Sequence, residues 1–125
     1  MKIYCAHSKK IAYKKDLYDP IKESHLVREH EFIFPHETDE THESKEIIRG
    51  CDGVIAEVSE CATGMGIEMG WANMMDKPIY CFYRSGTKPS GSLSFVCGTM
   101  EEYGDEGDLV KKNRTHPFFI SVVYK

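Results

Sequence analysis

The chain has 125 residues, of which 41% are hydrophobic and 29% are charged, and its formal net charge is −4. This size and composition predict one soluble globular domain over residues 1–125, with roughly two-thirds of its unfolded surface buried. The negative charge disfavours a nucleic-acid polymer as partner, because such binding needs a basic surface, but it permits a local pocket for one small anion.

The sequence shows neither a membrane segment nor a secretory signal. Its apolar runs are far shorter than the ~20 residues of a membrane helix. The first residues lack the apolar core of a signal peptide, so we expect a cytoplasmic protein without membrane contact. The five cysteines form no C-x-x-C pair, which favours reduced, structural thiols. Cys61, beside a glycine-rich turn, is the one candidate for a reactive thiol.

The first part of the chain predicts two strands separated by a helical stretch. Residues 2–6 are typical of a strand that leads into a polar turn at residues 7–10. Apolar spacing over residues 11–27 predicts a helix that is interrupted or kinked near Pro20. A short strand is expected at residues 31–34, followed by a polar, acidic surface loop at 36–42.

The rest of the chain continues the alternation. We expect a helix over residues 44–49, closed by Gly50 in the left-handed conformation, and then a buried strand over 53–58. Further expected elements are a turn at 62–66, a helix at 67–76, a strand at 79–83, a loop at 85–94, a short helix at 93–96, a strand at 99–103, a helix at 105–113 and an extended segment at 118–124. Alternating strands and helices predict an α/β fold with a mainly parallel sheet of about five strands, covered on both faces.

Two polar turns are expected at the carboxyl ends of strands, where open α/β sheets bind ligands. One is residues 7–10, the other is residues 59–66, and Glu68 follows the second in the expected first turn of a helix. The helix N-terminus favours an ionised carboxylate, and a carboxylate beside a sugar can attack C1' to form a covalent glycosyl intermediate. A G-x-G before a helix is common, however, so this pattern alone leaves a purely structural role open.

The longer motif is more specific. Residues 51–59 read C-D-G-V-I-A-E-V-S, residues 63–72 read T-G-M-G-I-E-M-G-W-A, and residues 3–8 read I-Y-C-A-H-S. Together with Lys77-Pro78-Ile79 and the segment 93–98, they resemble the nucleoside 2-deoxyribosyltransferase superfamily, which includes 2'-deoxynucleoside 5'-monophosphate N-glycosidases. The resemblance covers most of residues 2–98.

This resemblance implies a flavodoxin-like, Rossmann-like three-layer sandwich and a homodimer or larger homo-oligomer. It implies cleavage or exchange of the N-glycosidic bond of a small deoxynucleoside or its 5'-monophosphate, without cofactor or metal. Glu68 matches the nucleophile, and Tyr4 matches the residue that orients it. The expected substrate-binding residues lie in the turns and beside them: Ala6, His7, Ser8, Lys9, Lys10, Ser59, Ala62, Gly64, Gly66 and Ser94. By the same match, Ser94 reaches the phosphate of a neighbouring subunit.

Several positions depart from the family pattern. His7 replaces a glycine, and Lys9 and Lys10 replace the isoleucine and arginine of the phosphate-binding subgroup. Ala62 stands where transferases carry aspartate and monophosphate hydrolases carry serine. The nucleophile is preserved, but these changes leave the choice of substrate open.

A further departure concerns the acid that assists the leaving base. The family aspartate found 24 residues before the nucleophile, which handles the base or a sugar hydroxyl, aligns with Ser44. Asp39 or Glu43 in the acidic loop are alternatives for its role.

Other polar and aromatic residues have plainer interpretations. His36 and His42 lack the ordered spacing of a metal site, so a solvated loop is favoured. Trp71 and Met69 are expected in the core or at a dimer interface, and Glu57 is expected to orient backbone or a neighbouring side chain. Hydrolase and transferase both remain open, as do a catalytically inactive nucleotide-binding module and an interaction domain without ligand.

Overall fold

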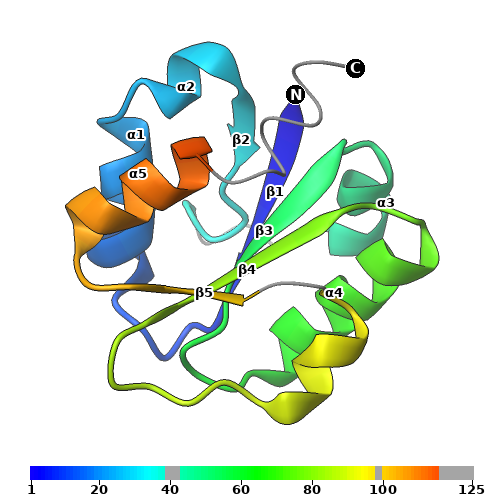
Figure 1. Cartoon of the computed structure of the whole chain (residues 1–125). Helices are drawn as coiled ribbons and strands as arrows, with labels where there is room; N and C mark the ends of the chain where they lie inside the picture. The colour runs from blue at the N-terminus through cyan, green and yellow to red at the C-terminus, as the bar shows by residue number, and fades with distance from the viewer. Residues whose placement is uncertain (39–42, 98–99, 116–125) are drawn as a thin grey trace.

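The structure is a computed structural model, and it describes residues 1–38, 43–97 and 100–115. Within these residues one parallel sheet has the strand order β2-β1-β3-β4-β5 (Figure 1). Its strands are β1 (Lys2–His7), β2 (Glu31–Ile33), β3 (Gly53–Glu57), β4 (Ile79–Arg84) and β5 (Met100–Tyr103). The predicted α/β fold with a five-stranded parallel sheet is confirmed.

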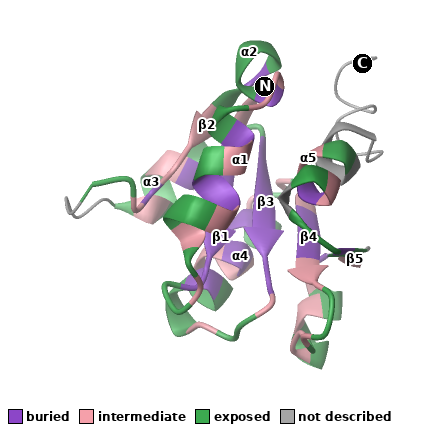
Figure 2. Ribbon diagram, turned by 90° about the vertical axis from the view of Figure 1, so that its left-hand side faces the viewer, coloured by how far each residue is buried: buried purple, intermediate pink, exposed green. Residues whose placement is uncertain are grey.

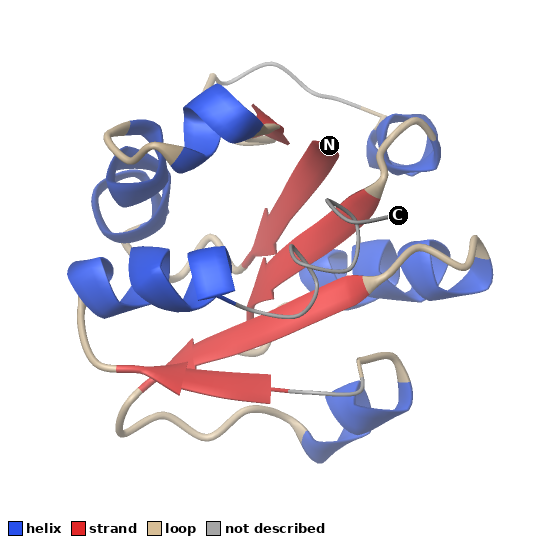
Figure 3. Ribbon diagram, turned by 45° about the horizontal axis from the view of Figure 1, so that its top comes forward, coloured by secondary structure: helices blue, strands red, loops and turns tan. Residues whose placement is uncertain are grey.

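Helices cover both faces of the sheet (Figure 3). One face carries the π-helix η1 (Lys14–Tyr18) and the α-helices α1 (Asp19–Lys22), α2 (Leu26–Glu29) and α5 (Glu106–Thr115). The other face carries α3 (Ser44–Arg49), α4 (Thr63–Met74) and the 3-10 helix η2 (Gly91–Phe95). The result is the three-layer sandwich that the sequence predicts.

The central strands separate two hydrophobic clusters, because successive side chains of a strand point to opposite faces. Ile3 and Cys5 of β1 pack in the cluster beneath η1, α1 and α5. Tyr4 and Ala6 pack in the cluster beneath α3 and α4. Every residue of β3 is buried, as the near-continuous apolar run predicts (Figure 2). The alternation therefore points Tyr4 towards α4.

The helix expected over residues 11–27 is divided into three pieces. The π-helix η1 gives way to α1 at Asp19, next to Pro20, as an interruption there predicts. A second break, which the sequence did not indicate, follows at Ser24. There the hydroxyl of Ser24 donates to the carbonyl of Ile21 at 2.6 Å and accepts the N–H of Leu26 at 3.2 Å. These bonds replace helical ones and divide α1 from α2.

Two further expectations need correction. Gly50 ends α3 with φ −82° and ψ −4°, so it is right-handed rather than left-handed. The segment 62–66 is not a turn, because α4 begins at Thr63, four residues earlier than expected. Met65 and Met69 explain the early start, since both are buried one helical turn apart against the sheet. The extended segment expected at 118–124 lies outside the described residues.

Candidate active site

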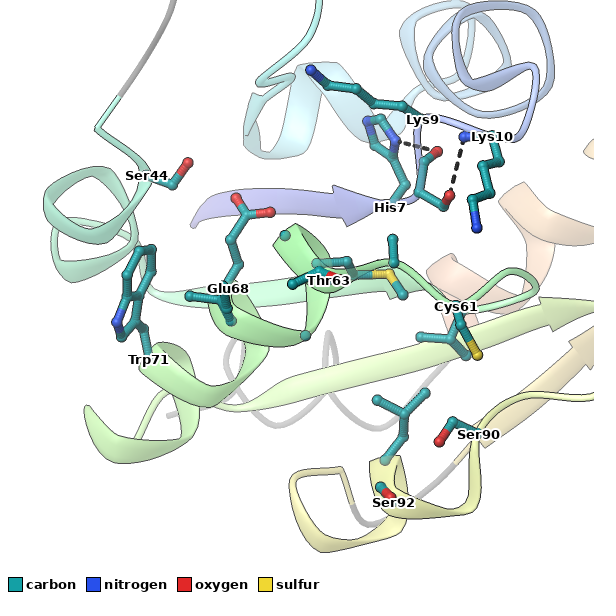
Figure 4. Close-up of a pocket in the computed structure, with 18 of the residues that line it drawn as sticks. His7, Lys9, Lys10, Ser44, Cys61, Thr63, Glu68, Trp71, Ser90 and Ser92 are labelled. Carbon is teal, nitrogen blue, oxygen red and sulfur yellow. Dashed lines mark hydrogen bonds between the residues drawn. The ribbon is translucent and has the colours of Figure 1, made fainter.

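A cleft of about 960 Å³ lies at the carboxyl ends of β1 and β3 (Figure 4). This is where an open parallel sheet offers a ligand site. Its walls come from the first turn, the start of α3, the first half of α4 and the segment before and within η2. The lining residues are His7, Ser8, Lys9, Lys10, His36, Ser44, Val58, Cys61, Ala62, Thr63, Gly64, Met65, Gly66, Ile67, Glu68, Trp71, Ser90, Ser92 and Leu93.

Glu68 extends from α4 into this cleft and contacts β1. The hydroxyl of Tyr4 donates a hydrogen bond to Oε2 of Glu68. Ser44, the first residue of α3, places its Oγ 3.2 Å from the Tyr4 hydroxyl and also hydrogen-bonds to Glu68. Three segments of the chain thus meet at one carboxylate.

Burial dominates the electrostatics of this group. It raises the pKa of Glu68 above its ordinary value, while the hydrogen bonds from Tyr4 and Ser44 oppose that shift. Burial, followed by the charge of Glu68, raises the pKa of Tyr4, so its hydroxyl keeps its proton and remains a donor. The two hydrogen bonds favour the ionised form of Glu68, which is the form that can act as a nucleophile.

The sequence predicts that the N-terminus of a helix favours the ionised form of Glu68, and the structure does not place Glu68 there. Because α4 begins at Thr63, Glu68 lies in the second turn rather than the first, beyond the strongest effect of the helix terminus. Gly64 and Gly66 are helical residues, and neither has a positive φ. A Cβ at either glycine would meet nothing within 4 Å, so these glycines leave the cleft wall open beside Glu68.

The turn after β1 carries two lysines, and a hydrogen bond from its backbone to Ser8 holds its shape. The Oγ of Ser8 accepts the backbone N–H of Lys10 at 3.0 Å, and Ser8 itself is buried. Lys9 and Lys10 are exposed at the mouth of the cleft. Among the described lining residues these two cations face a single carboxylate, Glu68, so the cleft is locally more basic than the chain as a whole.

His7 is a buried part of the wall. Its Nδ1 lies 3.0 Å from the carbonyl oxygen of Ser8 and therefore donates, and its Nε2 accepts from the hydroxyl of Tyr18 at 2.5 Å. The ring also stacks on Tyr13. Burial, with smaller contributions from His36 and Lys9, lowers the pKa of His7 to about 4. Both ring nitrogens are bonded to the protein, so His7 contacts a ligand only through its ring.

Three of the expected substrate-binding residues lie outside the cleft lining. Ala6 is fully buried in the core. Ser94 is exposed, and its hydroxyl donates to the carbonyl of Gly91 at 2.8 Å. Ser59 ties two strands together, because its Oγ accepts the N–H of Arg84 at 2.8 Å.

Glu57 orients its surroundings, as the sequence predicts. Its carboxylate accepts the N–H of Ser59 at 2.6 Å, the hydroxyl of Ser59 at 3.0 Å and the hydroxyl of Tyr103 at 2.5 Å. These bonds hold the loop that follows β3 and leads into α4.

Several residues line the cleft although their sequence context does not predict it. His36, expected in a solvated loop, lies half-buried in the wall with its ring 5.4 Å from that of His7. Ser90 and Ser92 line the cleft where Ser94 was expected. Trp71 both packs against the core and lines the cleft. A run of three serines at every second position, 90, 92 and 94, was the available signal, but only the fold decides which of them face inward.

No group of three or more His, Cys, Asp or Glu side chains is placed to hold a metal ion in the ranges 1–38, 43–97 and 100–115. No helix in that part of the chain is both long and apolar enough to cross a membrane. His42 and Asp39 lie outside the described residues.

Solved structures share this fold. The CMP N-glycosidase BcmB of Clostridium botulinum is 22% identical, with a TM-score of 0.66 over 91% of this chain and 99% of that one. A 2-deoxyribosyltransferase of the psychrotolerant bacterium Bacillus psychrosaccharolyticus is 19% identical, with a TM-score of 0.59 over 87% and 90% of the two chains. A conserved protein of Enterococcus faecalis V583 is 13% identical, with a TM-score of 0.60 over 91% and 98%.

The first two neighbours are members of the nucleoside 2-deoxyribosyltransferase superfamily. This chain therefore has the α/β fold of that superfamily, in agreement with the resemblance carried by its motifs. No protein-family model matches the sequence, and no curated protein matches it.

Proposed function

We propose that this protein cleaves or exchanges the N-glycosidic bond of a 2'-deoxynucleoside or its 5'-monophosphate through a covalent deoxyribosyl intermediate on Glu68. One observation carries the proposal: the buried hydroxyl of Tyr4 donates to the Glu68 carboxylate at the wall of a ligand-sized cleft. Glu68 is the one carboxylate among the described lining residues, which fits a single nucleophile that forms and releases an ester.

In the first step a carboxylate oxygen of Glu68 attacks C1' from the face opposite the base. A C1'–O bond forms while the C1'–N bond breaks, and its electron pair leaves with the base, which takes up a proton. Tyr4 and Ser44 hold the carboxylate for this attack. Because Tyr4 and Ser44 only position the carboxylate and form no bond to the substrate in this step, loss of either side chain should slow the reaction without abolishing it.

In the second step an acceptor attacks C1' and gives up a proton, while the C1'–O bond to Glu68 breaks and restores the carboxylate. Water as acceptor makes the enzyme a hydrolase, and a second base makes it a transferase. Both steps are displacements without electron transfer, so no redox cofactor is required. His36 also lines the cleft, and an imidazole there can supply the proton that the departing base takes up.

Lys9 and Lys10 favour the 5'-monophosphate as substrate. They lie at the cleft mouth on the turn that Ser8 holds in shape, and positive charge there attracts a phosphate. The hydroxyls of Ser90 and Ser92 lie on the opposite wall and can hydrogen-bond the same substrate (Figure 4).

The proposal includes a homodimer or larger homo-oligomer. Ile67 and Met74 of α4 are 49% and 82% exposed, and Phe95 of η2 is 86% exposed. These apolar side chains lie on the elements that form the cleft, so a second copy covering them would also bring residues such as Ser94 near a neighbouring site. Full activity of a monomer at nanomolar concentration would contradict this part of the proposal.

The alternative is a nucleotide-binding module without turnover. Ala62 favours it, because this lining position supplies no polar side chain to the substrate. The Tyr4–Glu68 contact favours the enzyme, since binding alone requires no oriented carboxylate.

A substrate panel distinguishes these functions. The protein is incubated with deoxynucleosides and their 5'-monophosphates, with and without a free acceptor base, and released base is measured by chromatography. Base released without acceptor identifies a hydrolase, and exchange that requires the acceptor identifies a transferase. Tight binding with neither product supports the inactive module and rejects the proposal.

A further inference from the structure

Ser44 lies beside the atoms that surround the proposed nucleophile. Its Oγ is 3.2 Å from the hydroxyl of Tyr4 and also hydrogen-bonds to Glu68. In Figure 4 the Ser44 side chain projects from the start of α3 into the same part of the cleft as the Glu68 carboxylate. A group bound next to Glu68 therefore meets Ser44 as well.

The stereochemistry of attack determines which part of the substrate that group is. In a nucleoside the base projects from one face of the sugar ring, and a nucleophile that displaces it approaches C1' from the other face. The 2'-hydroxyl of a ribonucleoside is on that other face, on the carbon next to C1'. A ribose bound for attack by Glu68 thus directs its 2'-hydroxyl at the immediate surroundings of this carboxylate.

We propose that Ser44 contacts the 2' position of the sugar and allows the enzyme to accept ribonucleosides or ribonucleotides alongside the deoxy compounds. The inference rests on the proposed attack by Glu68 and extends the substrate class of the same site. The Tyr4 hydroxyl has one proton and donates it in the hydrogen bond to Glu68, so Ser44 is the neighbouring hydroxyl that can form a hydrogen bond with a 2'-hydroxyl.

A serine at this position suits both sugars. Its hydroxyl donates and accepts, so it can exchange a hydrogen bond with a 2'-hydroxyl of either orientation. When the sugar lacks that hydroxyl, Ser44 retains Tyr4 and Glu68 as partners and no buried polar group is left unpaired. Sites that reject an analogue lacking a hydroxyl do so because they leave such a group unpaired, and this one does not.

The test compares matched ribo and deoxyribo substrates with the same base and the same phosphate state. The ratio of kcat/KM for the two sugars is measured for wild type, Ser44→Ala, Ser44→Thr and Lys45→Ala. Lys45 is the exposed neighbour of Ser44 on α3 and lies outside the cleft lining, so it is the matched control. Alanine at position 44 keeps a good helix former in the first turn of α3, which protects the fold.

Wild type is expected to turn over both sugars with rates within about tenfold of each other. Ser44→Ala should lower the ribo-to-deoxyribo ratio roughly tenfold, the effect of one hydrogen bond of about 1.4 kcal/mol. Ser44→Thr should restore the ratio to within about threefold of wild type because it keeps the hydroxyl. Lys45→Ala should leave the ratio unchanged.

Failure of this inference and failure of the proposed function look different. Base release with a ratio that Ser44→Ala does not alter overturns the inference alone, as does a wild type that excludes ribose more than about a hundredfold. No base release from either series overturns the proposed function. In that case the dissociation constants of the two substrates for wild type and Ser44→Ala decide the inference, which falls if the variant leaves their ratio unchanged or if neither substrate binds.

Discussion

The hydroxyl of Tyr4 donates a hydrogen bond to the carboxylate of Glu68, which joins β1 to α4 across 64 positions of the sequence. Tyr4 is fully buried within the core beneath α3 and α4, so it cannot rotate freely away from its partner. A rigid donor on the sheet thus restrains a carboxylate on a helix. Such preorganisation lowers the cost of bringing a nucleophile to its target.

Tyr4→Phe removes this donor while keeping the aromatic ring in the core. Because the hydrogen bond favours ionised Glu68, its loss should raise the pKa of that carboxyl further. The acid limb of the kcat/KM profile should therefore move to higher pH. At neutral pH kcat should fall, by an amount that corresponds to the loss of roughly 1–3 kcal/mol of transition-state stabilisation. A pH–rate profile of both proteins measures this, and an unchanged profile would leave Tyr4 as a packing residue only.

The buried His7 should make the free energy of unfolding sensitive to acid. Its pKa is lowered to about 4 in the fold, so the unfolded chain, in which histidine has its ordinary value of about 6.5, binds more protons between those limits. Stability should therefore fall as the pH is lowered from about 6.5 towards 4, by up to about 3 kcal/mol from this group. Urea unfolding of wild type and His7→Gln at several pH values tests it.

The quantity to compare is the difference in unfolding free energy between wild type and His7→Gln at each pH. Burial also lowers the pKa of His30 and raises that of Glu68, so other groups add their own slopes, and Glu68 acts in the opposite direction. Subtracting the variant removes those contributions. Identical pH slopes for wild type and His7→Gln would show that His7 is protonated equally in both states.

Lys9 and Lys10 predict a salt-dependent preference for the phosphorylated substrate. A Lys9→Ala/Lys10→Ala double variant should lose discrimination between a deoxynucleoside 5'-monophosphate and the nucleoside, chiefly through KM. The loss should shrink at high salt, because exposed charges are screened over about 8 Å at physiological ionic strength. Steady-state kinetics on both substrates at two salt concentrations measure the effect.

A matched variant controls for net charge. Lys14→Ala/Lys15→Ala also removes two positive charges, but from exposed positions of η1 that do not line the cleft. It should leave the preference for the phosphorylated substrate intact. Should wild type prefer the nucleoside, or should both double variants behave alike, the lysines at the cleft mouth do not select phosphate.

Much of the fold could be predicted because parallel strands are buried and therefore apolar. The runs around Val54 and Tyr80 identify their strands without reference to any neighbour. The start of α4 could not be predicted, since Gly64 and Gly66 have low helix propensity. Burial of Met65 and Met69 overrides that propensity, and this depends on the sheet beneath them.

The candidate site divides in the same way. Glu68 and Tyr4 were found through the motif that carries the family resemblance, and the geometry then brought them together. His36 and Ser90 could not be found, because their inward direction depends on how loops cross the sheet end rather than on their neighbours in sequence. Ser44 stood out only as a departure from a pattern, and its contact with Tyr4 gives that departure a physical meaning.

Glu68 is the proposed covalent nucleophile, and the whole proposed reaction passes through its ester. The most direct measurement is the turnover of Glu68→Gln on the best substrate of the panel, alongside its dissociation constant. Glutamine keeps the shape of the side chain but cannot form the ester, so turnover should fall by several orders of magnitude while the fold and the affinity stay close to wild type. Turnover above about 10% of wild type would contradict the central claim, because the loss of a covalent nucleophile does not leave that much activity.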